Sequence, residues 1–148
     1  MRPREVFLSH ASADKALARR VIRALEAQRI DVWFAPYRLV GSQRWHDEIG
    51  RALQRCDWFV LLLSKNSVRS RWVKNEVLFA LNEPTLADRI VPVLTEDCEW
   101  RRLSWTLGSI QRVDFRPGLQ EGLADLLRVW KIDASETPRK RKRRKRDR

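Results

Sequence analysis

Trp72 and Glu76 are the pair whose residue types and spacing suggest chemistry. Four positions apart in a helix, two side chains lie on one face and can address one ligand. A carboxylate fixed there can stabilise developing positive charge, act as a nucleophile or act as a base, and all three roles stay open. The simplest alternative for Glu76 is a solvated residue that pairs with Lys74 or Arg71. For Trp72 the alternative is packing in the core.

The elements that must position this pair are short β-type segments that alternate with helical ones. Such alternation predicts an α/β fold with a parallel sheet covered by helices on both faces. The third segment, WFVLLL, has no polar alternation, and the fourth is nearly as apolar, as expected of strands buried on both sides. Pro92 removes one ladder donor, so we expect its strand to bulge or to lie near an edge. The five segments are Glu5–Ser9, Asp31–Ala35, Trp58–Leu63, Arg89–Leu94 and Arg112–Phe115.

The helical segments show apolar residues at helical spacing. Between residues 14 and 29, Leu17, Val21 and Leu25 recur every four positions, which predicts an amphipathic helix. Ser12 and Asp14 are candidates to cap its start. Further helices are expected over Gln43–Gln54, Ser70–Asn82 and Gly118–Trp130, with a short irregular one over Trp100–Leu107.

Length and cysteine content indicate one domain in a reducing compartment. The 148 residues suffice for a buried core, and Cys56 and Cys98 have no paired spacing, so neither a disulfide framework nor a metal site is expected. The apolar stretch near the start is too short for a signal peptide. The longest apolar run, Trp58–Leu63, is far shorter than the roughly 20 residues that cross a bilayer. We therefore expect a cytoplasmic protein without a membrane span.

The chain has a net charge of +12, much of it near the C-terminus, where Arg139–Arg146 are eight consecutive basic residues. Such a segment buries nothing, so we expect a disordered basic tail over residues 133–148, after a domain over residues 1–132. The tail contains no aromatic residue to stack on bases. We expect weak, nonspecific, salt-sensitive anion binding from it, with a solvated tail as the alternative.

Four stretches, in this order, resemble the TIR (Toll/interleukin-1 receptor) domain family, and the resemblance covers roughly residues 5–130. It implies a flavodoxin-like, five-stranded parallel sheet in the order 2-1-3-4-5. In open sheets of this kind, ligands bind beyond the carboxyl ends of the strands, where the strand order switches. The stretches are VFLSHASAD, DVWFAPYRLVGSQRW, DWFVLLLSKNSVRSRWVKNE and RIVPVL.

The resemblance also implies an activity, because the Trp72-x-x-x-Glu76 pattern matches the catalytic glutamate of the family and the tryptophan one turn before it. The implied reaction is NAD+ glycohydrolysis, which gives nicotinamide and ADP-ribose or a cyclic ADP-ribose isomer. Breaking this bond develops oxocarbenium-like charge on the ribose, which a nearby carboxylate stabilises. No G-x-G-x-x-G follows the first strand, so NAD+ is expected as a substrate and no cofactor or metal is implied.

The remaining site residues follow from their matches to the family. Ser9 and His10 stand where the family has polar residues that line the cleft, and we expect them to contact substrate. For His10, the roles of a general base and of a simple strand cap also stay open. Trp33 stands where an aromatic residue lies near nicotinamide, although either Trp33 or Phe34 points inward. Arg38 is assigned to a phosphate of NAD+, with a solvated loop arginine as the alternative. Trp72 is assigned to substrate binding beside Glu76.

Two functions remain open at this stage. The first is an NAD+ nucleosidase activated by self-association, in signal transduction or antiphage defence. The second is a non-catalytic module that binds other TIR domains. In both, the segment Pro36–Ser42 resembles the family's BB loop, which takes part in self-association; Pro36 and Gly41 suit its turns.

Overall fold

Parallel strands and helices alternate along the computed structural model, which describes residues 2–34 and 43–135. Between the helices lie short 3-10 turns, two of which replace the irregular helix expected near residues 100–107. These turns are η1 (Ser12–Asp14), η3 (Ser67–Arg69), η4 (Trp100–Arg102) and η5 (Trp105–Ser109). The strands are β1 (Glu5–Ser9), β2 (Asp31–Phe34), β3 (Trp58–Leu63), β4 (Ile90–Leu94) and β5 (Val113–Asp114). The helices are α1 (Lys15–Ala27), α2 (Gln43–Arg55), α3 (Arg71–Asn82) and α4 (Leu119–Val129).

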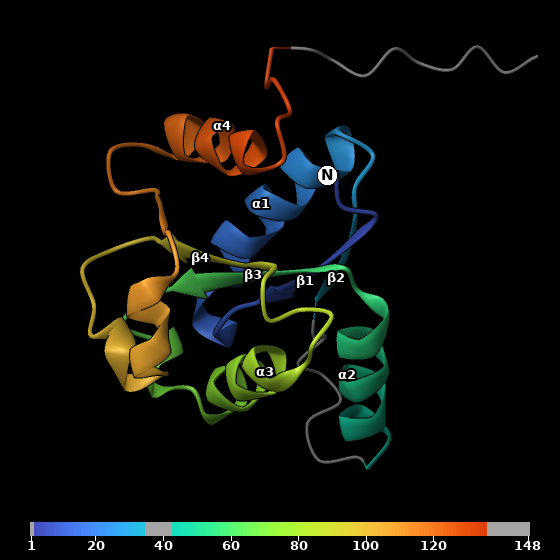
Figure 1. Cartoon of the computed structure of the whole chain (residues 1–148). Helices are drawn as coiled ribbons and strands as arrows, with labels where there is room; N and C mark the ends of the chain where they lie inside the picture. Colours follow the sequence, from blue (N-terminus) through green and yellow to red (C-terminus); the bar gives the residue numbers. More distant parts are fainter. Residues whose placement is uncertain (1, 35–42, 136–148) are drawn as a thin grey trace, which may run out of the picture.

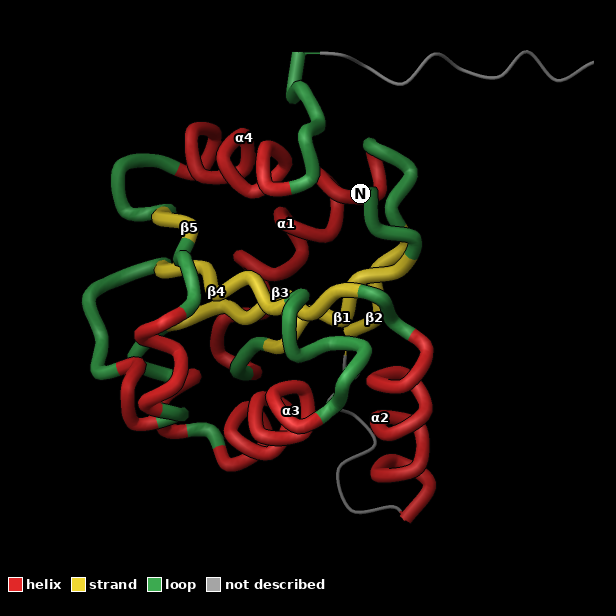
Figure 2. Tube along the Cα trace, viewed as in Figure 1, coloured by secondary structure: helices red, strands yellow, loops and turns green. Residues whose placement is uncertain are grey.

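The strand order is β2-β1-β3-β4-β5, and every pairing is parallel (Figure 2). Helices α1 and α4 cover one face of the sheet, and α2 and α3 cover the other (Figure 1). The predicted flavodoxin-like fold is therefore confirmed. The strand order reverses direction between β1 and β3, which makes the carboxyl ends of these two strands the switch point.

Side-chain alternation divides the core into one layer on each face of the sheet. In β1, Val6 and Leu8 join the layer under α1 and α4, whereas Phe7 joins the layer under α2 and α3. Residues of β3 divide in the same way, with Val60 on the first side and Leu61 on the second. Both faces are covered, so β3 needs apolar residues at every position, as predicted.

Pro92 lies inside β4 without a bulge, because β4 and β3 stay in register from Ile90 to Leu94. The N–H of Thr95 donates to β3, and the N–H of Phe115 bonds the carbonyl of Leu94 on the β5 side. Along a strand, the backbone N–H and C=O groups of successive residues point alternately to the two neighbouring strands. The nitrogen of Pro92 therefore points toward β5. Pairing with β5 begins only at Val93, so the missing donor costs no ladder bond. The strand of Pro92 was expected either to bulge or to lie near an edge of the sheet. The structure shows the second arrangement, because β4 lies next to the edge strand β5.

The ends of the helices test the capping predictions. Asp14, one of the two predicted candidates, is the N-cap residue of α1, but its side chain makes no capping hydrogen bond, and Ser12 lies in the preceding 3-10 turn. The reason is a competing partner for the Asp14 carboxylate, described below. At α3, Ser70 is the N-cap, and its hydroxyl oxygen accepts a hydrogen bond from the Val73 N–H at 3.2 Å.

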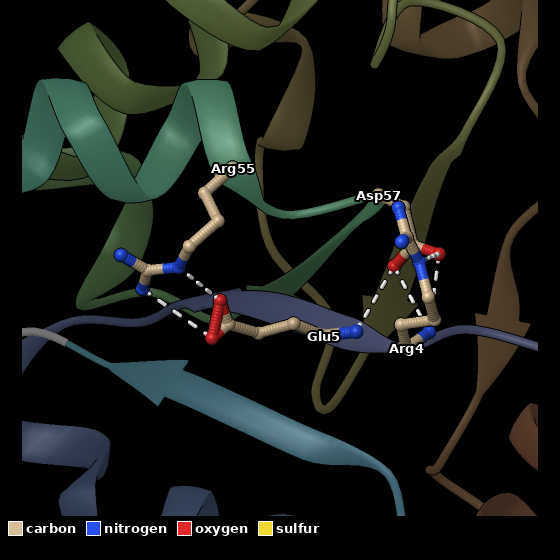
Figure 3. Close-up of polar contacts among 4 residues, drawn as sticks. All are labelled: Arg4, Glu5, Arg55 and Asp57. Atoms are coloured by element: carbon tan, nitrogen blue, oxygen red, sulfur yellow. Dashed lines mark hydrogen bonds and ion pairs between the residues drawn. The ribbon is translucent and has the colours of Figure 1, made fainter.

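A polar cluster joins the start of β1 to the end of α2 and the residue before β3 (Figure 3). It lies at the amino ends of these strands, whereas the switch point lies at their carboxyl ends. The Asp57 carboxylate accepts hydrogen bonds from the backbone N–H groups of Arg4 and Glu5, at 3.0 to 3.1 Å. Beside it, the Arg55 guanidinium pairs with the Glu5 carboxylate. The cluster therefore sets where β1 enters the sheet, and with it the position of Ser9 at the other end.

Candidate active site

Glu76 lies on the face of α3 that packs against the sheet. The buried residues of this helix are Val73, Glu76, Val77 and Ala80, spaced three or four apart, so they form one stripe. Glu76 is 5% exposed. Lys74 and Arg71 are both exposed to solvent. The alternative in which Glu76 pairs with them at the surface is therefore wrong.

The side chain of Ser9, at the carboxyl end of β1, reaches this carboxyl group. Ser9 Oγ donates a hydrogen bond to Glu76 Oε1 at 3.1 Å, and Ser9 is 1% exposed. The second oxygen, Oε2, is buried and has no hydrogen-bond partner among the residues that the structure describes. A buried polar atom without a partner is costly in a folded protein, and such atoms cluster where a ligand or water completes the bonding.

The electrostatics of Glu76 follow from this burial. Burial raises the pKa of Glu76 to about 8, because the ionised form loses its hydration, and the hydrogen bond from Ser9 opposes this effect. At neutral pH the carboxyl group is therefore mostly protonated in the unliganded chain. A positive charge near Oε2 would favour the ionised form.

His10 follows Ser9 directly and is also buried. Burial lowers the pKa of His10 below its ordinary value, while a hydrogen bond with the Leu8 backbone and the negative charge of Asp14 act in the opposite direction. The imidazole is therefore mostly neutral at pH 7. A neutral imidazole can exchange a proton or accept a hydrogen bond, but it does not repel a cationic ligand.

The two tryptophans assigned to the site pack on the same side of the sheet as Glu76. The ring of Trp33 stacks on Phe7, with centroids 4.9 Å apart. Its neighbour Phe34 is 41% exposed, so Trp33 is the residue of this pair that points inward. Trp72 is half-buried against the same core layer. Both indoles therefore contribute to packing, which is the alternative that the sequence left open for Trp72.

A polar contact that the sequence did not predict joins the loops that follow β1 and β3, next to the switch point. The Asp14 carboxylate accepts hydrogen bonds from the hydroxyl of Ser64, at the end of β3, and from Asn66 Nδ2 at 3.1 Å. Ser64 and Ser67 also form a local turn, in which the backbone N–H of each residue donates a hydrogen bond to the side-chain oxygen of the other. The Ser67 hydroxyl in turn donates to the Ser64 carbonyl. Only the adjacency of β1 and β3 could have suggested this contact, because fifty residues separate Asp14 from Ser64.

Two surface cavities lie elsewhere along the carboxyl edge of the sheet. One, of about 380 Å³, lies between residues 65–69 and 97–102, and the other, of about 540 Å³, is lined mainly by residues 108–116. Neither is lined by Ser9 or Glu76. They therefore give no support to these residues as the floor of a preformed cavity.

Some predicted features fall outside the described residues, namely Arg38, the whole Pro36–Ser42 segment and the basic run Arg139–Arg146. Within residues 2–34 and 43–135, no group of three or more His, Cys, Asp or Glu side chains could hold a metal ion. In the same part of the chain, no helix is long and apolar enough to cross a membrane. Of the six residues assigned to the site, the structure directly joins Ser9 and Glu76.

Comparison with known proteins gives a family match and a shared fold. A sequence model of the TIR domain matches residues 6–129. The TIR domain of the Toll-related receptor TRR-2 from Hydra magnipapillata superposes with a TM-score of 0.63 at 16% identity, over 83% of this chain and 97% of that one. The TIR domains of the activated Roq1 resistosome, which recognises the pathogen effector XopQ, give 0.62 at 17% identity, over 85% and 98%. No curated protein matches the sequence.

Proposed function

Because the chain belongs to the TIR domain family, we propose that it is an NAD+ glycohydrolase that breaks the bond between nicotinamide and ribose, with Glu76 as the catalytic residue. The observation that carries this proposal is the buried Glu76 carboxyl group, held by Ser9 through one oxygen, while the other oxygen has no partner among the described residues. It lies beside the carboxyl end of β1, next to the switch point where ligands of such sheets bind.

The chemistry of the bond suits a buried carboxyl group. The nicotinamide ring of NAD+ is cationic, so its approach favours the ionised form of Glu76 and offsets the effect of burial. As the C1′–N bond breaks, its electron pair moves to the ring nitrogen and neutral nicotinamide leaves. Positive charge then develops on the ribose, and the Glu76 carboxylate stabilises it from its buried position.

The product depends on what attacks C1′ next. Attack by water, with loss of one proton, gives ADP-ribose, whereas attack by an adenine nitrogen gives a cyclic isomer. His10, mostly neutral at pH 7, is placed next to Ser9 and is proposed to contact the substrate. Trp33 and Trp72 are proposed to line the substrate site on the face of the sheet that α3 covers, and Arg38 is proposed to bind a phosphate.

Self-association is the proposed trigger, through the Pro36–Ser42 segment, and signalling or antiphage defence in the cytoplasm is the proposed setting. The Roq1 neighbour supports this idea, because its TIR domains are part of an activated resistosome. The same observation favours the second candidate function, a non-catalytic module that only binds other TIR domains. The two candidates differ in whether nicotinamide is released.

The deciding experiment measures nicotinamide release from NAD+ by chromatography, with the protein in dilute solution and concentrated on a crowding surface. We expect release by the wild-type chain and none by Glu76→Gln. The matched control is Glu48→Gln, because Glu48 is an exposed helix glutamate on the same side of the sheet. Equal release by Glu76→Gln would remove Glu76 from the mechanism. No release by the wild type in any assembly state would favour the non-catalytic module.

A further inference from the structure

The contact between Ser9 and Glu76 gives Ser9 a different role from the substrate contact expected from the sequence. We propose that Ser9 is a positioning residue, whose hydroxyl holds Glu76 Oε1 and leaves Oε2 as the oxygen that meets the ribose. This inference rests on the proposed NAD+ glycohydrolase function. It assigns to each oxygen of one carboxyl group a separate task.

The geometry supports this division because both partners stand on rigid elements. Ser9 pairs in register with Leu61 of the central strand β3, so its backbone is fixed from the sheet side. Glu76 lies in the middle of α3, whose first turn is capped by Ser70 and whose buried face packs on the sheet. A short serine side chain has one rotatable bond to its hydroxyl, so the 3.1 Å hydrogen bond restricts the glutamate at little entropic cost.

Hydrogen-bond capacity argues against a substrate contact through the Ser9 proton. A serine hydroxyl has one proton to donate, and here Glu76 Oε1 accepts it. At 1% exposure, Ser9 also has almost no surface to offer a ligand. By contrast, Glu76 Oε2 is the buried oxygen that still lacks a partner within the described residues. The substrate is therefore expected to meet the carboxyl group and not the serine.

The hydrogen bond also has an electrostatic effect that can be measured without substrate. Burial raises the pKa of Glu76, and the bond from Ser9 is the opposing contribution; within residues 2–34 and 43–135, no charged group adds to either. The nearby ionisable group at the strand end is His10, itself buried and mostly neutral. Removing the Ser9 hydroxyl should therefore raise the pKa of Glu76 further, because the ionised form loses the one hydrogen-bond donor that the described residues supply.

The experiment compares Ser9→Ala, Ser9→Thr and Ser64→Ala in the full chain. Ser64 is the matched control, because it is a buried serine at the end of β3 whose hydroxyl donates to Asp14 and not to Glu76. The first readout is the carboxyl ¹³C titration of Glu76, assigned by its absence in Glu76→Gln. We expect the pKa to rise by about one pH unit in Ser9→Ala and to stay unchanged in Ser9→Thr and Ser64→Ala.

The second readout is the rate of nicotinamide release as a function of pH. Ser9→Ala should lower kcat about tenfold with little change in KM and move the acidic limb of the profile to higher pH, and Ser9→Thr should restore both. A higher KM with an unmoved Glu76 titration would overturn the proposal and return Ser9 to a substrate contact.

The two readouts separate failure of this inference from failure of the proposed function. If the wild type cleaves no NAD+, the proposed function fails, and the titration still decides whether Ser9 controls the Glu76 carboxyl group. If Ser9→Ala does not fold, Ser9→Cys keeps the size with a weaker donor and should shift the titration in the same direction. An unmoved titration in a folded Ser9→Cys variant would overturn the inference.

Discussion

Asp14 and Ser64 join the loops that follow β1 and β3 through a hydrogen bond from the Ser64 hydroxyl to the Asp14 carboxylate. The same carboxylate accepts from Asn66, and its charge partly offsets the burial that lowers the pKa of His10. One side chain thus fixes the β3–α3 loop and influences the imidazole at the end of β1. This double role leads to the first prediction.

Asp14→Asn should lower the pKa of His10, because the favourable negative charge is lost while the shape of the side chain is kept. Asp14→Ala should lower it as well and should also loosen the loop, since Ser64 and Asn66 lose their acceptor. We expect a stability loss of about 1 to 3 kcal/mol for the alanine variant. NMR titration of His10 and amide exchange at residues 64–67 measure the two effects. A His10 titration that is identical in Asp14→Asn and the wild type would contradict the electrostatic link.

Glu76 should make the folded chain less stable as the pH rises. Its pKa is about 8 in the folded chain against 4.5 as the ordinary value, so the folded state binds the proton more tightly. Its stabilising contribution is complete below pH 4.5 and is lost as the pH rises through about 8. Glu76→Gln lacks this proton, so its stability should not follow the same slope.

The cleanest window for this test lies between pH 7 and 8.5. A lowered pKa of His10 affects stability only toward acid pH, and the raised pKa values of Cys56 and Cys98 matter above pH 9. Urea unfolding should show a loss of about 1 kcal/mol across the window in the wild type and in Glu48→Gln. Glu76→Gln should show almost none. A parallel slope in all three proteins would mean that Glu76 is ionised in the folded chain.

Asp57 should matter more to stability than Arg55, although both belong to the cluster at the start of β1 (Figure 3). Asp57 accepts from two backbone N–H groups, and its alanine variant leaves both without that acceptor. We expect a loss of about 1 to 3 kcal/mol. The Arg55 side chain is 55% exposed, so Arg55→Ala should lose at most about 1 kcal/mol. Chemical denaturation of both variants measures the difference, and a larger loss for Arg55→Ala would reverse this ranking.

The fold was predictable because its signals are local. The uniform apolar run of β3 and the four-residue spacing of Leu17, Val21 and Leu25 in α1 each appear within one segment. Most element types were correct, and the strand order that the resemblance to the TIR family implied is confirmed. The differences are the ends of elements, such as α1 beginning at Lys15 after a 3-10 turn, and the helix expected near residues 100–107, which is two 3-10 turns. Asp14 shows why ends are harder, since a distant hydroxyl outcompetes the local capping interaction.

The site was predictable only in part, because its contacts cross the chain. The spacing of Trp72 and Glu76 placed both on one helix, but not the face that each occupies. The bond between Ser9 and Glu76 joins residues 67 positions apart and depends on β1 and α3 meeting at the switch point. Burial of Glu76 likewise depends on how α3 packs on the sheet. The sequence could therefore name the residues, whereas their mutual contacts required the fold.

The two helix glycines Gly122 and Gly50 should respond in opposite ways to alanine. A Cβ at Gly122, in α4, would lie 2.3 to 2.9 Å from three ring atoms of Phe115, so the ring or the helix must move. We expect Gly122→Ala to destabilise the chain by about 1 to 3 kcal/mol. A Cβ at Gly50, in α2, would meet nothing within 4 Å. There the gain in helix propensity should stabilise the chain by about 0.4 to 1 kcal/mol.

Thermal unfolding of the two alanine variants tests this contrast, with each serving as the control for the other. Phe115 follows β5, so the packing of Gly122 on its ring is what brings α4 close to the short edge strand. A Gly122→Ala variant with reduced stability should regain most of it when Phe115 is also replaced by leucine, because the smaller side chain leaves room for the new methyl group. If Gly122→Ala alone is as stable as Gly50→Ala, α4 does not pack on Phe115 this closely.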